Sequence, residues 1–120
     1  MLNLDTHILV FALTDRLRPK EKALLSKERW GISAIVLWEI AKLFQLGRIE
    51  VDFEDPVVVR ALSQVHLWPI DLPICRELRS LDFRGDPADE LIAATSIVHR
   101  APLVTRDSKM LKSRLVPLAG

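Results

Sequence analysis

Several residue types that carry well-known chemistries are scarce in this chain. One cysteine, Cys75, occurs among 120 residues, so an internal disulfide cannot form. Its apolar sequence neighbours predict a small buried residue rather than a nucleophile, since no base is placed beside it. Only four glycines are present, and neither a glycine-rich phosphate loop nor a Gly-x-Ser-x-Gly turn occurs. These absences exclude a disulfide scaffold, a glycine-rich nucleotide fingerprint and a serine-hydrolase elbow.

Long apolar runs and an excess of one charge are also missing. No run approaches the ~20 residues of a membrane span, and Asp5 interrupts the N-terminal segment where a signal sequence would become apolar. We therefore expect a cytoplasmic protein with no membrane attachment. The formal net charge is +1, so affinity for nucleic acid must come from a local basic patch or from bound cations. His7, His66 and His99 lack metal-ligand spacing, and we expect structural or surface roles for them.

The residues that are present suffice for one folded domain. Hydrophobic residues make up 49% of the chain and charged residues 28%, which favours a single globular domain over residues 1–120. Short apolar runs alternate with helical patterns, which predicts an α/β fold. We expect strands at 1–4, 30–32, 65–70, 101–105 and 115–118. We expect helices at 6–13, 18–29, 34–46, 56–63, 72–81 and 86–98, and a short one from 107. The three tryptophans, Trp30, Trp38 and Trp68, fall in strands or apolar helices and are expected in the core.

Four acidic residues occur where predicted strands end or where a helix is otherwise apolar. Asp5 and Asp107 follow two of the predicted strands, and the carboxyl ends of parallel strands share one edge of a sheet. Glu39 lies inside an apolar helix, where burying an unpaired carboxylate is costly. Asp89 falls in the first turn of a helix that can direct it toward the same edge. We therefore expect the four side chains to converge.

Converging carboxylates repel one another, so their pKa values rise or they bind a cation. Ligands that are all oxygen suit Mg²⁺ or Mn²⁺, and such an ion activates water and polarises a phosphate. The pattern therefore points to hydrolysis of a phosphodiester. Each acid also has a structural interpretation, as a helix cap, a turn residue or a first-turn acid. That interpretation does not explain why acids recur at one strand edge and inside an apolar helix.

Four segments that contain these acids follow one another along the whole chain. They are Leu4-Asp5-Thr6-His7, Ser33 to Ala41, Asp86 to Thr95 and Leu103 to Asp107. Their order and spacing resemble the motifs of PIN-domain toxins of the VapC type. One departure is Arg84, which stands where related sequences often carry a histidine two residues before the Asp-Pro pair. Arg84 leaves the acids intact, and the substrate positioning implied by the resemblance stays open at this point, with phosphate contact by Arg84 as one alternative.

The resemblance implies a PIN-like three-layer α/β/α sandwich with a central, mostly parallel sheet. It also implies an endoribonuclease that depends on Mg²⁺ or Mn²⁺. The catalytic residues it implies are Asp5, Glu39, Asp89 and Asp107, of which Asp5, Asp89 and Asp107 are the expected metal ligands. The supporting residues it implies are Thr6, Thr105 and Asp86. Asp86 is either a site residue or only a helix N-cap.

Partners are expected from the same resemblance: an RNA substrate, a cognate antitoxin and a second copy of the chain in a homodimer. The candidate RNA-binding residues are Arg84, Arg18, Lys20 and Lys22, although a basic stretch is more often a solvated helix face than an RNA-binding surface. The apolar face around Leu37 and Phe44 is suited to the core, to a homodimer or to a partner helix.

Two other classes of function are alternatives to the nuclease. The first is a PIN-like module that binds RNA or protein without cleaving, and the intact set of acids argues against it. The second is a phosphatase with an aspartate nucleophile. His7 stands where such enzymes usually carry a second aspartate, two residues after the first, so we rank this class below the nuclease.

Overall fold

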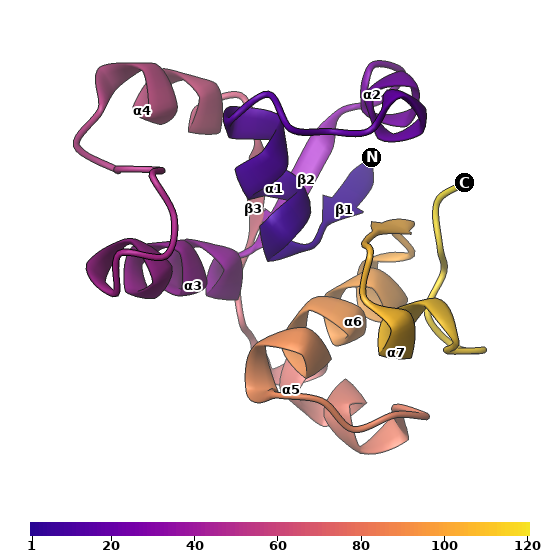
Figure 1. Ribbon diagram of the computed structural model, residues 1–120. Coiled ribbons are helices and arrows are strands. Elements are labelled where there is room, and N and C mark those ends of the chain that lie inside the picture. Colours follow the sequence, from indigo (N-terminus) through magenta and orange to yellow (C-terminus); the bar gives the residue numbers. More distant parts are fainter.

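A four-stranded parallel sheet lies at the centre of the computed structural model, which describes residues 1–120 (Figure 1). The strands are β1 (Leu2–Leu4), β2 (Trp30–Ser33), β3 (His66–Trp68) and β4 (Leu103–Val104), in the order β3-β2-β1-β4. All three strand pairs are parallel, with Leu2 opposite Trp30, Asn3 opposite Leu103 and Ile32 opposite Leu67. This confirms the predicted α/β class and the parallel sheet.

Seven α-helices and one 3₁₀ turn connect and cover the strands. They are α1 (Thr6–Leu13), α2 (Pro19–Leu25), α3 (Ala34–Gln45), α4 (Pro56–Leu62), α5 (Leu72–Glu77), η1 (Leu78–Ser80), α6 (Pro87–His99) and α7 (Ser108–Leu111). Right-handed crossovers in this strand order place α1 to α4 on one face and α5 with α6 on the other. Figure 1 shows α1, α2 and α4 grouped apart from α5, α6 and α7. The result is the expected three-layer α/β/α sandwich.

The face of the sheet toward α6 is fastened by one buried polar side chain. The Asn3 amide nitrogen donates to the Ile92 carbonyl at 3.0 Å and to Ser96 Oγ at 2.9 Å. Because side chains alternate across a strand, Leu2 and Leu4 point to the opposite face and are fully buried there. The two bonds fix the axial position of α6 against β1, and α6 carries one of the predicted site residues.

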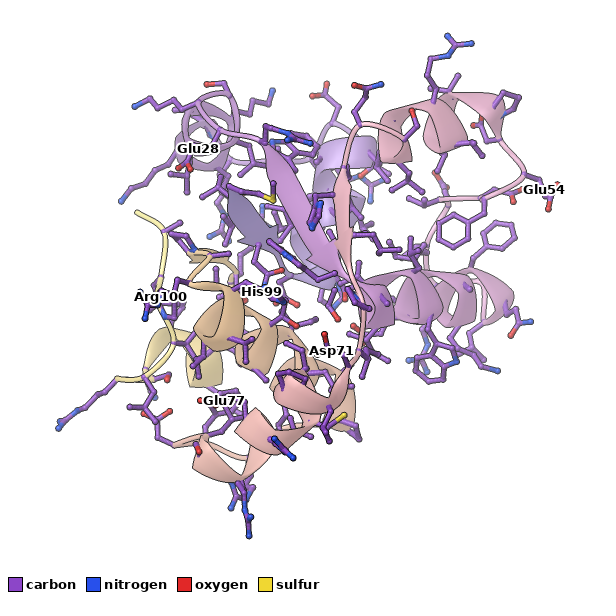
Figure 2. All side chains as sticks on the ribbon, turned by 180° about the vertical axis from the view of Figure 1, so that it is seen from behind. Glu28, Glu54, Asp71, Glu77, His99 and Arg100 are labelled. Atoms are coloured by element: carbon purple, nitrogen blue, oxygen red, sulfur yellow. The ribbon has the colours of Figure 1, made fainter.

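A ring stack closes the same face at the other edge of the sheet. Trp68 is buried and stacks on His99, which is labelled in Figure 2, at the end of α6, with ring centroids 5.3 Å apart. A side chain at Gly31 would begin 2.5 Å from the Trp68 ring, so β2 requires glycine at this point. The stack thereby joins β3 to α6 through side chains, a contact that the backbone hydrogen bonds within each element do not provide.

Two predicted core positions are wrong. Cys75 is exposed because the neighbouring residue Ile74 takes the buried side of α5, and successive helical residues point about 100° apart. Trp38 is 56% exposed because Val36 and Ile40 occupy the buried side of α3. Phe44, farther along the helix, is 41% exposed, so much of the predicted apolar face of α3 is open to solvent.

Several element boundaries also differ from the prediction. The helix expected at 18–29 ends at Leu25, where the indole nitrogen of Trp30 donates to the Leu25 carbonyl at 2.8 Å. The helix expected at 72–81 tightens into η1 for its last turn. The final strand expected at 115–118 is reduced to one parallel bridge between Leu103 and Leu118. None of the helices has the length and apolar character needed to cross a bilayer.

Candidate active site

Two of the four predicted acids lie at the carboxyl ends of neighbouring strands, as expected. Asp5 follows β1, and its Oδ1 accepts the Thr6 backbone N–H at 2.8 Å as the N-cap of α1. Asp107 follows β4, and its Oδ1 accepts the backbone N–H groups of Lys109 and Met110 as the N-cap of α7. Both acids are therefore helix caps, so the structural interpretation holds for them without removing them from the site.

One hydroxyl connects these two strand ends. Thr105 Oγ1 donates to Asp5 Oδ2 at 2.6 Å and accepts the Asp107 backbone N–H at 3.0 Å. Thr105 thus holds Asp5 from behind and sets the start of the loop that carries Asp107. This contact agrees with the supporting role expected for Thr105.

The third acid, Glu39, reaches the same place from α3. Ser33 caps this helix through a bond from the Ile35 N–H, and Glu39 lies one and a half turns further on. The Thr6 hydroxyl donates to Glu39 Oε1, which ties α3 to the start of α1. Glu39 Oε2 accepts no hydrogen bond from the protein, so it is available to a ligand.

The fourth acid, Asp89, comes from the first turn of α6. Asp86 caps this helix by accepting the Asp89 backbone N–H at 2.9 Å. The Asp89 carboxylate itself accepts no hydrogen bond from the protein. Gly85 lies against it, since an added Cβ there would come within 3.2 Å of Asp89 Cβ. Asp86 is a helix cap that also lines the pocket, and its role in the site stays a prediction.

These side chains line one pocket of about 380 Å³, here called the acidic pocket. Its walls are Asp5, Thr6, His7, Phe11, Glu39, Asp86, Asp89, Arg106 and Asp107. All four predicted catalytic acids are therefore brought together, with Thr6 and Asp86 beside them and Thr105 directly behind Asp5.

The charge in the acidic pocket is poorly compensated. Burial, followed by the neighbouring acids Asp86, Asp5, Asp107 and Glu39, raises the pKa of Asp89 to about 7. Burial also raises the pKa of Asp5 and of Glu39, although hydrogen bonds from Thr105 and Thr6 act in the opposite direction. Because burial and mutual repulsion disfavour the charged carboxylates, a cation bound among them would stabilise the pocket.

The donor set fits a hard divalent ion. Asp89, Glu39 Oε2 and Asp107 Oδ2 accept no hydrogen bond from the protein, and every candidate ligand atom is a carboxylate oxygen. No three of the side chains converge as a complete ligand set. Mg²⁺ is commonly held by one or two carboxylates while it keeps several waters, so an open arrangement of this kind suits it.

Three members of the pocket were not assigned a site role from the sequence. The Arg106 guanidinium donates to both oxygens of Glu21 at 2.7 Å and lies 4.1 Å from the Phe11 ring centroid. This pairing lowers the pKa of Glu21 to about 2. His7, for which a structural or surface role is expected, is exposed at the pocket wall.

The positions of Arg106 and Glu21 each carry a local signal in the sequence. Arg106 stands between Thr105 and Asp107 in a strand-end loop, where a charged residue is close to the site by position alone. Glu21 stands three residues after Arg18, at the place of a capping-box acid, and its Oε1 accepts the Arg18 N–H at 2.8 Å. The contact between Arg106 and Glu21 spans 85 residues, which no local pattern reveals.

The basic residues predicted to bind RNA lie outside the acidic pocket. Arg18 and Lys20 line a separate hollow that also contains Thr105. Lys22 pairs with Asp15 at 3.4 Å on the surface. Arg84 is exposed, and its guanidinium contacts only the neighbouring Phe83 carbonyl.

Comparisons with solved structures show the same fold elsewhere. VapBC2 from Rickettsia felis, in a crystal structure with a DNA fragment from its promoter, has a chain with a TM-score of 0.73 and 21% identity; the match covers 98% of this chain and 97% of that one. A chain of a toxin–antitoxin complex from Klebsiella pneumoniae matches with a TM-score of 0.70 and 23% sequence identity. The match covers 93% of this chain and 91% of that one. A chain of FitAcB from Neisseria gonorrhoeae matches with a TM-score of 0.72 and 22% sequence identity. The match covers 100% of this chain and 97% of that one.

Sequence comparison identifies the family. No curated protein matches the chain at a significant level. The profile of the PIN domain matches residues 3–114, which include every acid of the pocket. The chain therefore belongs to the PIN-domain family.

Proposed function

We propose that this protein is an endoribonuclease that hydrolyses RNA phosphodiester bonds with Mg²⁺ or Mn²⁺. The observation that carries the proposal is the acidic pocket, in which four carboxylates from two helices and two strand-end loops share a single space. Arg106 is the one arginine or lysine of its walls, and its guanidinium is already engaged by Glu21. The pocket is thus left with a negative charge that a metal ion would neutralise.

Each acid has a separate role in this proposal. The metal ion is held among Asp5, Asp89 and Asp107, by one or two of these carboxylates directly and by the rest through its waters, with Thr105 orienting Asp5. When bound, a divalent ion of this kind polarises the phosphate and lowers the pKa of a water. Glu39, whose Oε2 is free, accepts the proton of the attacking water, and Thr6 fixes the orientation of its carboxylate.

We infer a cellular role from the similar structures, one of which is described as a toxin–antitoxin complex. Residues 1–120 form a single PIN domain that acts in the cytoplasm as the toxin of such a pair, inhibited by a cognate antitoxin. The protein forms a homodimer. Arg18, Lys20, Lys22 and Arg84 contribute contacts to the RNA backbone.

The test is digestion of single-stranded RNA by purified protein with Mg²⁺ or Mn²⁺, with EDTA, and with metal restored after EDTA. We expect internal cleavage with metal, none in EDTA and recovery on restoration. Full cleavage in the chelator contradicts the metal mechanism. Binding of RNA without cleavage under every metal condition favours the alternative, a non-cleaving PIN-like module that binds RNA or protein. A small phosphomonoester assayed in parallel separates the nuclease from a phosphatase.

A further inference from the structure

A second hollow of about 530 Å³ adjoins the acidic pocket and shares two of its walls, His7 and Phe11. We call it the arginine hollow, because Arg16 and Arg48 line it. It lies along α1 and the end of α3, two helices that pack against each other. The two spaces therefore adjoin at His7 and Phe11, with the acids on one side of this shared wall and the arginines on the other.

Arg16 and Arg48 each follow a helix C-cap of the same type. At the end of α1, Asp15 takes a left-handed conformation with φ of 56°, and the Arg16 N–H donates to the Phe11 carbonyl at 2.8 Å. At the end of α3, Gly47 has φ of 70°, and the Arg48 N–H donates to the Leu43 carbonyl at 2.9 Å. Each is the six-to-one bond of a Schellman motif. Two helix ends thus present one arginine each to a common space.

Neither guanidinium is engaged within the protein. The side chains of Arg16 and Arg48 make no hydrogen bond and no ion pair, and both residues are exposed. Arg106, whose Nε and Nη2 both donate to Glu21, is the contrasting case. The charged walls of the arginine hollow are Arg16, Arg48 and Glu50, which leaves one uncompensated positive charge beside a negative pocket.

We propose that the arginine hollow binds backbone phosphates of the RNA strand next to the bond that is cut. This inference rests on the proposed function and names the substrate subsite of that same cleft. The α1 helix of eight residues is about 12 Å long, so a strand crossing the acidic pocket reaches Arg16 within a few nucleotides. Guanidinium groups suit phosphate because they offer paired donors. Phe11 and His7, at the shared wall, offer ring surface to a base between the two sites.

The experiment measures binding of a fluorescein-labelled oligouridylate to the full chain in EDTA across a series of salt concentrations. Arg16→Gln with Arg48→Gln should lower the affinity by at least about tenfold. It should also reduce the slope of log affinity against log salt by about 0.7 for each arginine lost. Arg60→Gln is the matched control, because Arg60 lies in the last turn of α4, away from both spaces, and should change neither quantity.

A charge at a helix end also stabilises that helix, so stability is measured on the same variants. Arg16→Lys with Arg48→Lys keeps the charge and should retain the salt slope while weakening the affinity. The single glutamine variants each test one arginine should the double variant fail to fold. An unchanged slope in folded glutamine variants overturns the proposal, as does a wild-type chain that binds no oligouridylate in EDTA. Arginine-dependent binding without cleavage in Mg²⁺ would instead leave this inference standing and contradict the nuclease.

Discussion

Single residues at the site serve the fold and the proposed chemistry together. Asp5 and Asp107 cap helices through one carboxylate oxygen and present the other toward Thr105 or the acidic pocket. Asparagine caps a helix about as well as aspartate does. We therefore expect Asp5→Asn and Asp107→Asn to fold normally and to lose RNA cleavage.

Thermal melting and circular dichroism in metal-free buffer check this first prediction. Melting temperatures should equal or exceed that of the wild type, since each change removes charge from a crowded pocket. If both variants unfold, the two acids serve only as caps and the site assignment is wrong.

The second prediction concerns the pH dependence of stability. The pKa of Asp89 rises from 3.8 to about 7 on folding, because burial and four nearby acids disfavour its charge. The folded state then binds the extra proton between these values, so the free energy of unfolding falls as pH rises from about 4 to about 7. The loss is on the order of 1–2 kcal/mol, less than the whole shift implies, because Asp89 is partly exposed.

Urea unfolding without metal at the two ends of this pH range measures the effect. Asp89→Asn should flatten the dependence, and Glu54→Gln, at an exposed acid far from the pocket (Figure 2), should leave it unchanged. A wild-type protein that becomes more stable as pH rises through this range would show that the acids are better compensated than the structure indicates.

At this scale, the acids could be predicted from the sequence because carboxylates at strand ends and inside an apolar helix are locally conspicuous. The burial of Cys75 and Trp38 was predicted wrongly, since an apolar run does not reveal which side of a short helix faces the sheet. The pairing of Arg106 with Glu21 was missed because the two residues are distant in sequence.

Among the elements, α6 matters most to the site because it carries Asp89. The buried amide of Asn3 holds this helix against β1 through Ile92 and Ser96. Asn3→Leu should lower the free energy of unfolding by about 1–3 kcal/mol, since both acceptors lose their donor in a dry environment. It should also slow cleavage, because Asp89 moves with its helix.

A double-mutant cycle with Ser96→Ala tests this third prediction by urea unfolding. Ser96→Ala removes one of the two bonds, so the loss should be smaller, and the double variant should be little worse than Asn3→Leu alone. Strictly additive losses would show that the two side chains do not interact.

The order and type of the elements could be predicted from periodicity and cap residues, and α1 has the predicted bounds. The ends of α2 and α5 could not, because each is decided by a tertiary contact or by a change to a 3₁₀ turn. The strand expected near residue 116 is one bridge, since β4 itself has only two residues with which to pair.

For the molecule as a whole, the fourth prediction concerns regulation. An unrestrained ribonuclease harms its own cell, so expression of the chain alone should arrest growth and Asp5→Asn should abolish the arrest. The antitoxin we propose docks an amphipathic helix on the face of α3 around Leu37, which is half-buried, and Phe44, which is exposed. It directs an arginine or lysine at the carboxylates near Glu39.

Growth after induction checks this prediction. The chain is expressed alone and together with the gene adjacent to its own, which we propose encodes the antitoxin. Co-expression should yield a complex in which cleavage is suppressed. If the chain alone is harmless and Asp5→Asn changes nothing, the toxin role fails even where cleavage in vitro survives.

The central claim is that the fold gathers Asp5, Asp89 and Asp107 into one site for a divalent ion. Calorimetric titration of Mn²⁺ into the wild type, Asp107→Asn and the surface control Arg60→Gln tests it most directly. We predict saturable binding by the wild type and by Arg60→Gln, and an affinity at least about tenfold weaker for folded Asp107→Asn. Absence of saturable binding by the wild type, or equal affinity in all three proteins, would contradict the account.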